Sequence, residues 1–156
     1  MKLHIAHRNF IDKLESEGKS SSTLTAYGKD IEQLIEHVTE LEVEVVQDME
    51  LKHLESFMDH LADKGYTAKS ISRKTNAART FVGFLHEMGH IAKNFGLKLK
   101  HPKVKQKDPR ILSKLEYRAL RDAARGDIRS YAMIEFLIQT GITISELSAM
   151  EMEHIE

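Results

Sequence analysis

Five polar residues recur at helical spacing in the middle of the chain and could together bind phosphate groups. They are Lys69, Ser72, Arg73, Asn76 and Arg79. On a helix these positions form one continuous strip, because residues three and four apart are neighbours on the helix surface. Lys, Arg, Ser and Asn are side chains that proteins use to contact nucleic-acid phosphates. The pattern therefore predicts a phosphate-binding face, with Lys74 at its margin.

Two further groups of residues extend this polar surface. Ser22, Thr25 and Lys29 line one side of an earlier predicted helix. A lysine-rich segment follows the first strip and contains Lys98, Lys100, Lys103, Lys105 and Lys107. A solvated face is the alternative for any single lysine, but the whole pattern favours nucleic-acid binding. Arg73 and Asn76 are the candidates for contacts with base edges in the major groove.

The segment HEMGH, residues 86–90, matches the HExxH pattern of zinc proteases, in which two histidines flank a general-base glutamate. Such a site needs both imidazoles on one well-formed helix and a third ligand. Gly89, and the end of the apolar periodicity at Met88, predict that the helix ends before His90. We therefore expect an ordinary helix terminus here and no bound metal.

Charge is divided unevenly along the chain, although the formal net charge is only -1. Residues 30–63 contain eleven acidic residues and one basic residue, a net charge of -10. Residues 64–110 contain twelve basic and two acidic residues, a net charge of +10. Such a separation suggests a polyanionic partner for the basic half. Mutual attraction of the two halves as packed helices is the alternative, and the two interpretations are compatible.

The composition narrows the class of protein. A length of 156 residues suits one domain, or one domain and part of a second. A hydrophobic fraction of 41% and a charged fraction of 30% are typical of a soluble globular protein. No apolar run is long enough for a membrane span or a secretory signal. The absence of cysteine excludes disulfides and thiolate metal sites and favours a reducing cytoplasm. We expect no cofactor and no membrane among the partners.

Apolar periodicity predicts an all-α fold that begins with four helices. We expect these helices near residues 4–16, 19–38, 48–63 and 67–88. The predicted N-terminal caps of the second, third and fourth helices are, in that order, Ser21 or Ser22, Asp48 and Thr67. The first, third and fourth helices are expected to end at Gly18, Gly65 and Gly89. The first helix is expected to bury Ile5, Phe10, Ile11 and Leu14.

Both prolines, Pro102 and Pro109, lie in the basic segment 98–110, which is predicted to be an extended linker. Ser113 and Glu116 after it form a predicted capping box. A further helix is expected from a cap at Asp127 to a stop at Gly141, and a short helical turn from Ser145. The residues of that longer helix expected to be mostly buried are Tyr131, Ile134, Phe136, Leu137 and Ile138.

Several of these segments resemble, in order, parts of the tyrosine recombinase, or phage integrase, family. SSTLTAYGKDIEQL is similar to the second helix of the family's core-binding domain, with Thr23, Tyr27 and Asp30 in the family's order. KSISRKTNAARTFVGFLHEMGHIAKNF is similar to the helix that ends this domain. PRILSKLEYRALRDAA resembles the entry into the family's catalytic domain, and the resemblance covers nearly the whole chain.

The resemblance implies a four-helix, SAM-like core-binding bundle that grips one face of duplex DNA. A basic linker and the first two or three helices of an incomplete catalytic domain would follow. We accordingly expect a DNA-binding domain over 1–97, the linker over 98–110 and the start of the catalytic domain over 111–156.

The segment TGITISEL, residues 140–147, resembles the family's TG-x-R-x-SEL motif, whose arginine is the first catalytic arginine. That position is Thr143 in this sequence. A threonine hydroxyl has neither the charge nor the bidentate fork of a guanidinium group. Glu146 matches an acidic position that, by the resemblance, helps to shape the turn. Tyr117 and Tyr131 precede the motif and do not match the family's tyrosine nucleophile.

The expected function is DNA binding as the N-terminal part of an integrase-like recombinase that acts in DNA integration and recombination. We expect no catalysis by this chain alone, which would be a fragment of a longer recombinase or a truncated relic in a mobile element. The alternative is an interaction or regulatory module that docks on a recombinase protomer or on a second copy. Exposed apolar residues such as Ile142, Ile144 and Leu147 would favour it. Residual strand cleavage is a third hypothesis.

Overall fold

The computed structural model is all-α over its described residues, 1–104, 108–151 and 153, as the apolar periodicity predicts. The β-structure in that part of the chain is limited to an isolated antiparallel bridge between Lys2 and Val45. The chain divides into two compact units, Met1–Gln106 and Lys107–Glu156, here called the first unit and the second unit. The predicted phosphate contact Lys105, and Lys107, lie outside the described residues.

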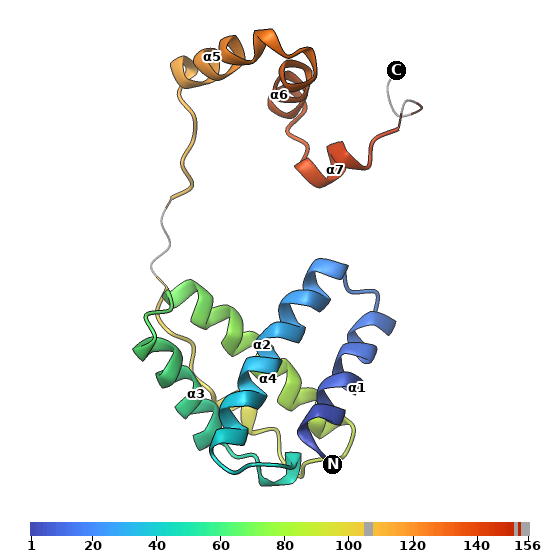
Figure 1. Cartoon of the computed structure of the whole chain (residues 1–156), viewed down its shortest axis with the longest axis vertical. Coiled ribbons are helices and arrows are strands. Elements are labelled where there is room, and N and C mark those ends of the chain that lie inside the picture. Colours follow the sequence, from blue (N-terminus) through green and yellow to red (C-terminus); the bar gives the residue numbers. More distant parts are fainter. Residues whose placement is uncertain (105–107, 152, 154–156) are drawn as a thin grey trace. The chain divides into compact units, whose positions relative to one another are not determined.

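Helices α1 to α4 form most of the first unit (Figure 1). The short 3-10 helix η1 lies between α2 and α3, and a second one, η2, follows α4. Their bounds are α1 (Leu3–Ser16), α2 (Ser21–Glu40), η1 (Val46–Asp48), α3 (Leu51–Asp63), α4 (Ala68–Glu87) and η2 (Phe95–Lys98). Helix α2 packs against each of the other three α-helices and crosses α4 in Figure 1. A position on α2 can therefore face α1, α3 or α4.

Side-chain caps fix where the helices of the first unit begin. Thr67 caps α4 as predicted, because its hydroxyl accepts a hydrogen bond from the Ser70 backbone N–H at 3.2 Å. The predicted cap of α2 was wrong by one residue. Ser20 has the extended backbone that a cap requires, whereas Ser21 already begins the helix.

The predicted cap of α3 was also wrong. Asp48 closes the 3-10 helix η1, and the chain then extends through Met49 before α3 begins. Glu50 caps α3 instead, in a capping box with His53. The intervening turn, which no apolar periodicity reveals, therefore moves the cap and the start of the helix by two residues.

The core of the first unit is built around aromatic side chains from α1 and α4. The ring centroid of Phe10 lies 5.3 Å from that of Phe81 and 5.5 Å from that of Phe84. Each large apolar side chain that is fully buried contributes roughly 1.5–3 kcal/mol to folding. Ile5 is 44% exposed, contrary to the prediction, because the buried face of α1 carries Leu3, Ala6, Phe10 and Leu14.

Helix η2 packs closely on α4 after the chain reverses at Gly89, whose φ is +71°. A Cβ atom at Gly96 would lie 3.0 Å from the Val82 Cβ and 3.3 Å from the Arg79 carbonyl oxygen, so the close approach requires glycine. Leu99, just after η2, is 3% exposed and belongs to the core. The first residues of the basic segment are therefore anchored to the first unit.

The second unit contains α5 (Lys114–Ala123), η3 (Ala124–Gly126), α6 (Ile128–Thr140) and α7 (Ile144–Ser148). The capping box of Ser113 with Glu116 begins α5, and Asp127 caps α6, both as predicted. Gly141 ends α6 with a φ of +71°. Across both units, no helix in the described part of the chain is long and apolar enough to cross a membrane.

Burial in the second unit differs from the prediction. None of its helices contains a buried residue among those described. Of the five α6 residues expected inside, Ile138 is 45% exposed and the other four, Tyr131, Ile134, Phe136 and Leu137, are only half-buried. Within the second unit, three short helices pack on one another, and so few short helices do not by themselves enclose a core.

Candidate nucleic-acid interface

Helix α4 carries the predicted phosphate-binding strip on its solvent side. Lys69, Arg73 and Asn76 are exposed, and Ser72 and Arg79 are half-buried. The Thr67 cap sets the start of the helix one residue later, so Lys69 stands in its first turn. All five side chains therefore reach the surface along the length of α4.

The predicted strip on α2 is also exposed. Ser22, Thr25 and Lys29 follow one another at spacings of three and four residues and have exposed side chains. Lys29 is followed directly by Asp30, whose side chain is 1% exposed. The end of the α2 strip therefore borders the place where α2 turns its buried side toward α4.

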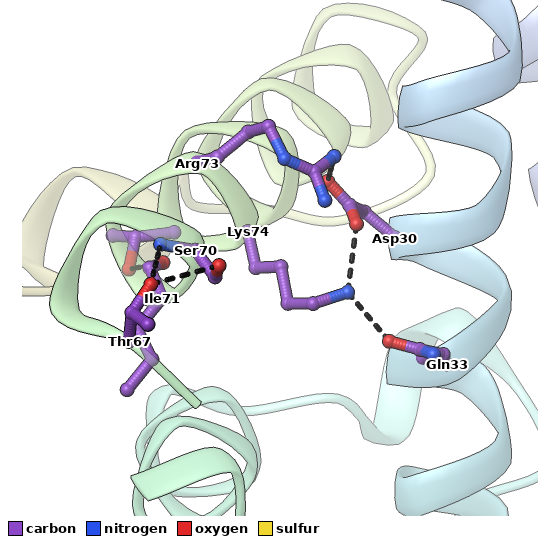
Figure 2. Close-up of polar contacts among 8 residues, drawn as sticks. Asp30, Gln33, Thr67, Ser70, Ile71, Arg73 and Lys74 are labelled. Atoms are coloured by element: carbon purple, nitrogen blue, oxygen red, sulfur yellow. Dashed lines mark hydrogen bonds and ion pairs between the residues drawn. The ribbon is translucent and has the colours of Figure 1, made fainter. Parts of the chain in front are cut away.

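An ion pair joins the two strips. Arg73 Nη1 of α4 donates a short hydrogen bond to Asp30 Oδ2 of α2, as Figure 2 shows. Lys29, the last residue of the α2 strip, is the chain neighbour of Asp30, so the α2 strip ends next to the residue that Arg73 contacts. We call the joined strips the α2–α4 face, and it consists of Ser22, Thr25, Lys29, Lys69, Ser72, Arg73, Asn76 and Arg79.

Lys74 does not lie at the margin of this face, contrary to the prediction, because the structure buries it. Its side chain is 5% exposed, and its Nζ lies 2.7 Å from Asp30 Oδ1 and 2.5 Å from Gln33 Oε1 (Figure 2). The ammonium group also lies 5.6 Å from the ring centroid of Tyr66. A buried ammonium group is tolerated only with such partners, so Lys74 serves the α2–α4 contact rather than a ligand.

The pairing of Asp30 with Lys74 is the feature that the sequence interpretation missed. A signal for it exists in the sequence. Asp30 lies between the apolar positions Tyr27 and Ile31, and Lys74 lies three residues after Ile71, so each charge stands on the apolar side of its helix. Opposite charges at core positions of two helices indicate a buried pair, because an isolated buried charge is too costly.

The described lysines of the basic segment lie at the surface of the first unit. Lys98 closes η2, and Lys100 and Lys103 are exposed. His101 of the same segment places its Nδ1 3.3 Å from the Ser72 hydroxyl oxygen of α4. That hydrogen bond brings the start of the basic segment next to the α2–α4 face.

The HEMGH segment forms a helix terminus. Helix α4 ends at Glu87, and the His90 backbone N–H bonds the Leu85 carbonyl oxygen at 2.9 Å, beyond the last helical residue. Glu87 accepts a hydrogen bond of 2.5 Å from Lys13, which lowers the pKa of the carboxyl group. Within the described residues, no group of three or more His, Asp or Glu side chains is placed to hold a metal ion.

The TGITISEL segment forms the turn between α6 and α7. Thr143 is the N-cap of α7, because its hydroxyl accepts a hydrogen bond of 3.2 Å from the Glu146 backbone N–H. The Glu146 carboxylate accepts hydrogen bonds of 2.7 Å from the backbone N–H and from the hydroxyl of Thr143. These bonds hold the pKa of Glu146 below its usual range. The hydroxyl of Thr143 is thus engaged in helix capping, and Glu146 shapes the turn.

Comparisons with known proteins point to one family. Residues 8–89 match the family described as phage integrase, N-terminal SAM-like domain. The chain is 30% identical over 143 residues to tyrosine recombinase XerD of Staphylococcus aureus (strain N315), a match that covers 89% of this chain and 48% of that protein. It is 33% identical to tyrosine recombinase XerC of Xylella fastidiosa (strain M23), with the same two coverages. The chain therefore spans about half the length of these relatives.

Solved structures share the fold. A lambda integrase dimer bound to a COC′ core site matches with a TM-score of 0.78 and 21% identity, over 100% of this chain and 43% of that one. A lambda integrase tetramer bound to a Holliday junction matches with a TM-score of 0.79 and 20% identity, over 100% of this chain and 44% of that one. At these identities the likeness establishes the fold alone.

Proposed function

Because the chain belongs to the phage integrase family, whose N-terminal SAM-like domain it contains, we propose that its first unit binds duplex DNA. The contacts lie on the α2–α4 face together with Lys100 and Lys103, and most of them are made to phosphates. The chain acts as the DNA-holding part of a site-specific recombinase.

The observation that carries this proposal is the joining of the two polar strips by Arg73 and Asp30. The ion pair engages the buried Asp30 carboxylate, and Lys29, Lys69 and Asn76 remain exposed. Lambda integrase structures of the same fold are bound to a core site and to a Holliday junction, which supports a duplex partner for the present chain.

The test is a binding titration of the full chain against a fluorescent duplex at increasing salt. Affinity should fall steeply as salt rises, because bound cationic groups release counterions from DNA. Lys69→Ala should weaken binding and reduce the slope of log K against log salt by about 0.9. Lys52→Ala is the matched control, because Lys52 is exposed but pairs with Glu50 in the acidic part of the chain. Absence of duplex binding at low salt, or equal losses in the two variants, would contradict the proposal.

We also propose that this chain does not cleave DNA by itself. Thr143 occupies the position of the family's first catalytic arginine, and its hydroxyl is engaged with Glu146. Tyr117 donates a hydrogen bond of 3.1 Å to Glu135 and lies beneath the guanidinium group of Arg121, which gives that tyrosine a structural role. A suicide duplex that traps covalent protein–DNA adducts should yield none, and an adduct would contradict this part of the proposal.

A second candidate function is docking on another recombinase protomer. It is favoured by the apolar side chains that the second unit exposes, of which Ile111 is 84% exposed, Leu115 76% and Ile144 75%. Exposed apolar surface of this kind marks interaction sites. Light scattering distinguishes the two functions, because a strict monomer that binds DNA favours the first and a stable oligomer without DNA favours the second.

A further inference from the structure

The ion pair of the α2–α4 face belongs to a cluster of four side chains with very different exposures. Asp30 and Gln33 come from α2, and Arg73 and Lys74 come from α4 (Figure 2). The Asp30 and Lys74 side chains are 1% and 5% exposed, whereas the Arg73 side chain is 48% exposed. The cluster thus has a buried part and one member that reaches solvent.

The buried part holds the Asp30 carboxylate in place. Lys74 donates to Asp30 Oδ1 at 2.7 Å and to Gln33 Oε1 at 2.5 Å, so it ties the carboxylate to the next turn of α2. The second oxygen, Oδ2, then faces Arg73. A carboxylate with one oxygen fixed in this way presents the other oxygen in a defined direction.

Arg73 uses only part of its hydrogen-bonding capacity in this cluster. A guanidinium group carries five N–H donors in a planar fork, and within the described residues its one recorded partner is Asp30, through Nη1. The side chain as a whole is 48% exposed, so the group is accessible to solvent. Pairing with Asp30 therefore orients the fork and leaves donors for an external acceptor.

We propose that Asp30 is a positioning residue for DNA binding, which fixes the Arg73 guanidinium at the junction of α2 and α4 so that its other donors meet the phosphate backbone. This inference rests on the proposed function and identifies a residue of the DNA-binding machinery that never touches DNA. A pre-oriented side chain binds more tightly because less conformational freedom is lost on association. For the exposed Lys69, no comparable hydrogen-bond partner is recorded among the residues that the structure describes.

Charge alone predicts the opposite result, which makes the inference testable. Removing the carboxylate at Asp30 makes the surface more positive and, by long-range electrostatics, should tighten DNA binding. Positioning predicts that Asp30→Asn weakens binding, because the neutral amide cannot serve both cations. Glu87→Gln is the matched control, since it makes the same change of charge at the end of α4 without contacting Arg73.

The experiment compares the full chain with its variants in the duplex titration, below the unfolding midpoint that each variant shows by circular dichroism. Asp30→Asn should weaken binding on the order of threefold to tenfold, as for loss of a charge-assisted hydrogen bond. Glu87→Gln should bind as the parent does or more tightly. In an Arg73→Ala background, Asp30→Asn should have no further effect on affinity, because the residue it positions is gone.

Three results would overturn the inference. These are unchanged or tighter binding by Asp30→Asn, an equal loss in the Arg73→Ala background, and a parent-like affinity for Arg73→Lys. The Arg73→Lys variant keeps the positive charge but lacks the planar guanidinium group. It therefore tests whether the orientation of Arg73 matters for DNA binding even if Asp30→Asn does not fold. Failure of the parent chain to bind the duplex would instead refute the proposed function itself, so the two failures are distinct.

Discussion

The two units begin their helices in the same way but differ in what those helices pack against. Thr67 in the first unit and Thr143 in the second both cap a helix through a side-chain hydroxyl. Yet Phe81 of the first unit is fully buried, whereas Ile138 of the second is 45% exposed. Local hydrogen bonds therefore determine where a helix starts, and the surrounding layers determine whether it has a core.

Capping and burial therefore contribute separately to the stability of each unit. The first unit should unfold cooperatively, because its buried side chains form one continuous cluster. The helices of the second unit depend more on local interactions, which are weak for segments of this length. The same kind of substitution should therefore have different effects in the two units.

The largest difference is expected for removal of an aromatic side chain. Phe81→Ala should destabilise the first unit by about 3–5 kcal/mol, because it leaves a cavity among packed rings. Phe136→Ala, at a half-buried position of α6, should cost about 1 kcal/mol or less. Urea denaturation followed by circular dichroism measures both, and equal losses would mean that the second unit has a core of its own.

A smaller difference is expected for glycine substitutions. Gly96→Ala should destabilise the first unit by about 1–3 kcal/mol, since its Cβ would press on Val82 and the backbone of Arg79. Gly126→Ala in the second unit has no heavy atom within 4 Å of the added Cβ and should be neutral or slightly stabilising. Thermal melts of the two variants test this, and a neutral Gly96→Ala would contradict the close approach of η2 to α4.

Removal of a capping hydroxyl should cost about 1 kcal/mol in either unit, but the readouts should differ. Thr67→Ala should lower the unfolding midpoint of the whole first unit, because α4 supplies much of the core. Thr143→Ala should increase amide hydrogen exchange only around α7. If Thr143→Ala lowered the unfolding midpoint of the first unit, the two units would not be independent.

The smallest effect is expected from acid, and it should be confined to the first unit. Burial lowers the pKa of His37, and His60 and Lys64 lower it further, although Glu40 opposes them. The folded chain therefore binds a proton at His37 less readily than the unfolded chain does. The free energy of unfolding keeps the full contribution of neutral His37 above about pH 6.5, and it decreases as the pH falls below that value. Unfolding midpoints between pH 7.5 and 5.5 measure the loss. His37→Gln should reduce it, and an unchanged pH dependence in that variant would contradict the assignment.

The local signals in the sequence predict much of the fold. The glycines at 89 and 141 end their helices with positive φ, and the caps at Thr67, Ser113 and Asp127 stand where hydroxyl or carboxylate groups precede apolar periodicity. These features depend on residues only a few positions apart. Ser20 was missed because three consecutive serines offer equivalent caps, and the choice among them depends on the backbone before the helix.

Features that depend on distant residues could not be predicted in the same way. The apolar pattern of α6 predicts a buried face but not whether another layer exists to cover it. Likewise the strip on α4 could be identified from spacing, whereas the inward position of Lys74 depends on Asp30, 44 residues earlier in the chain. A single sequence predicts which side of each helix is apolar, but it does not predict which other element packs against that side.

The capping box at Thr143 has a consequence for how this position can evolve. The residue is exposed, and the recorded hydrogen bonds of its hydroxyl group reach only Glu146. An arginine there would sacrifice a cap of about 1 kcal/mol on a helix of five residues and would disturb no packed side chain. Folding therefore imposes only a weak constraint on this site, and a Thr143→Arg substitution would need no compensating change in the side chains around it.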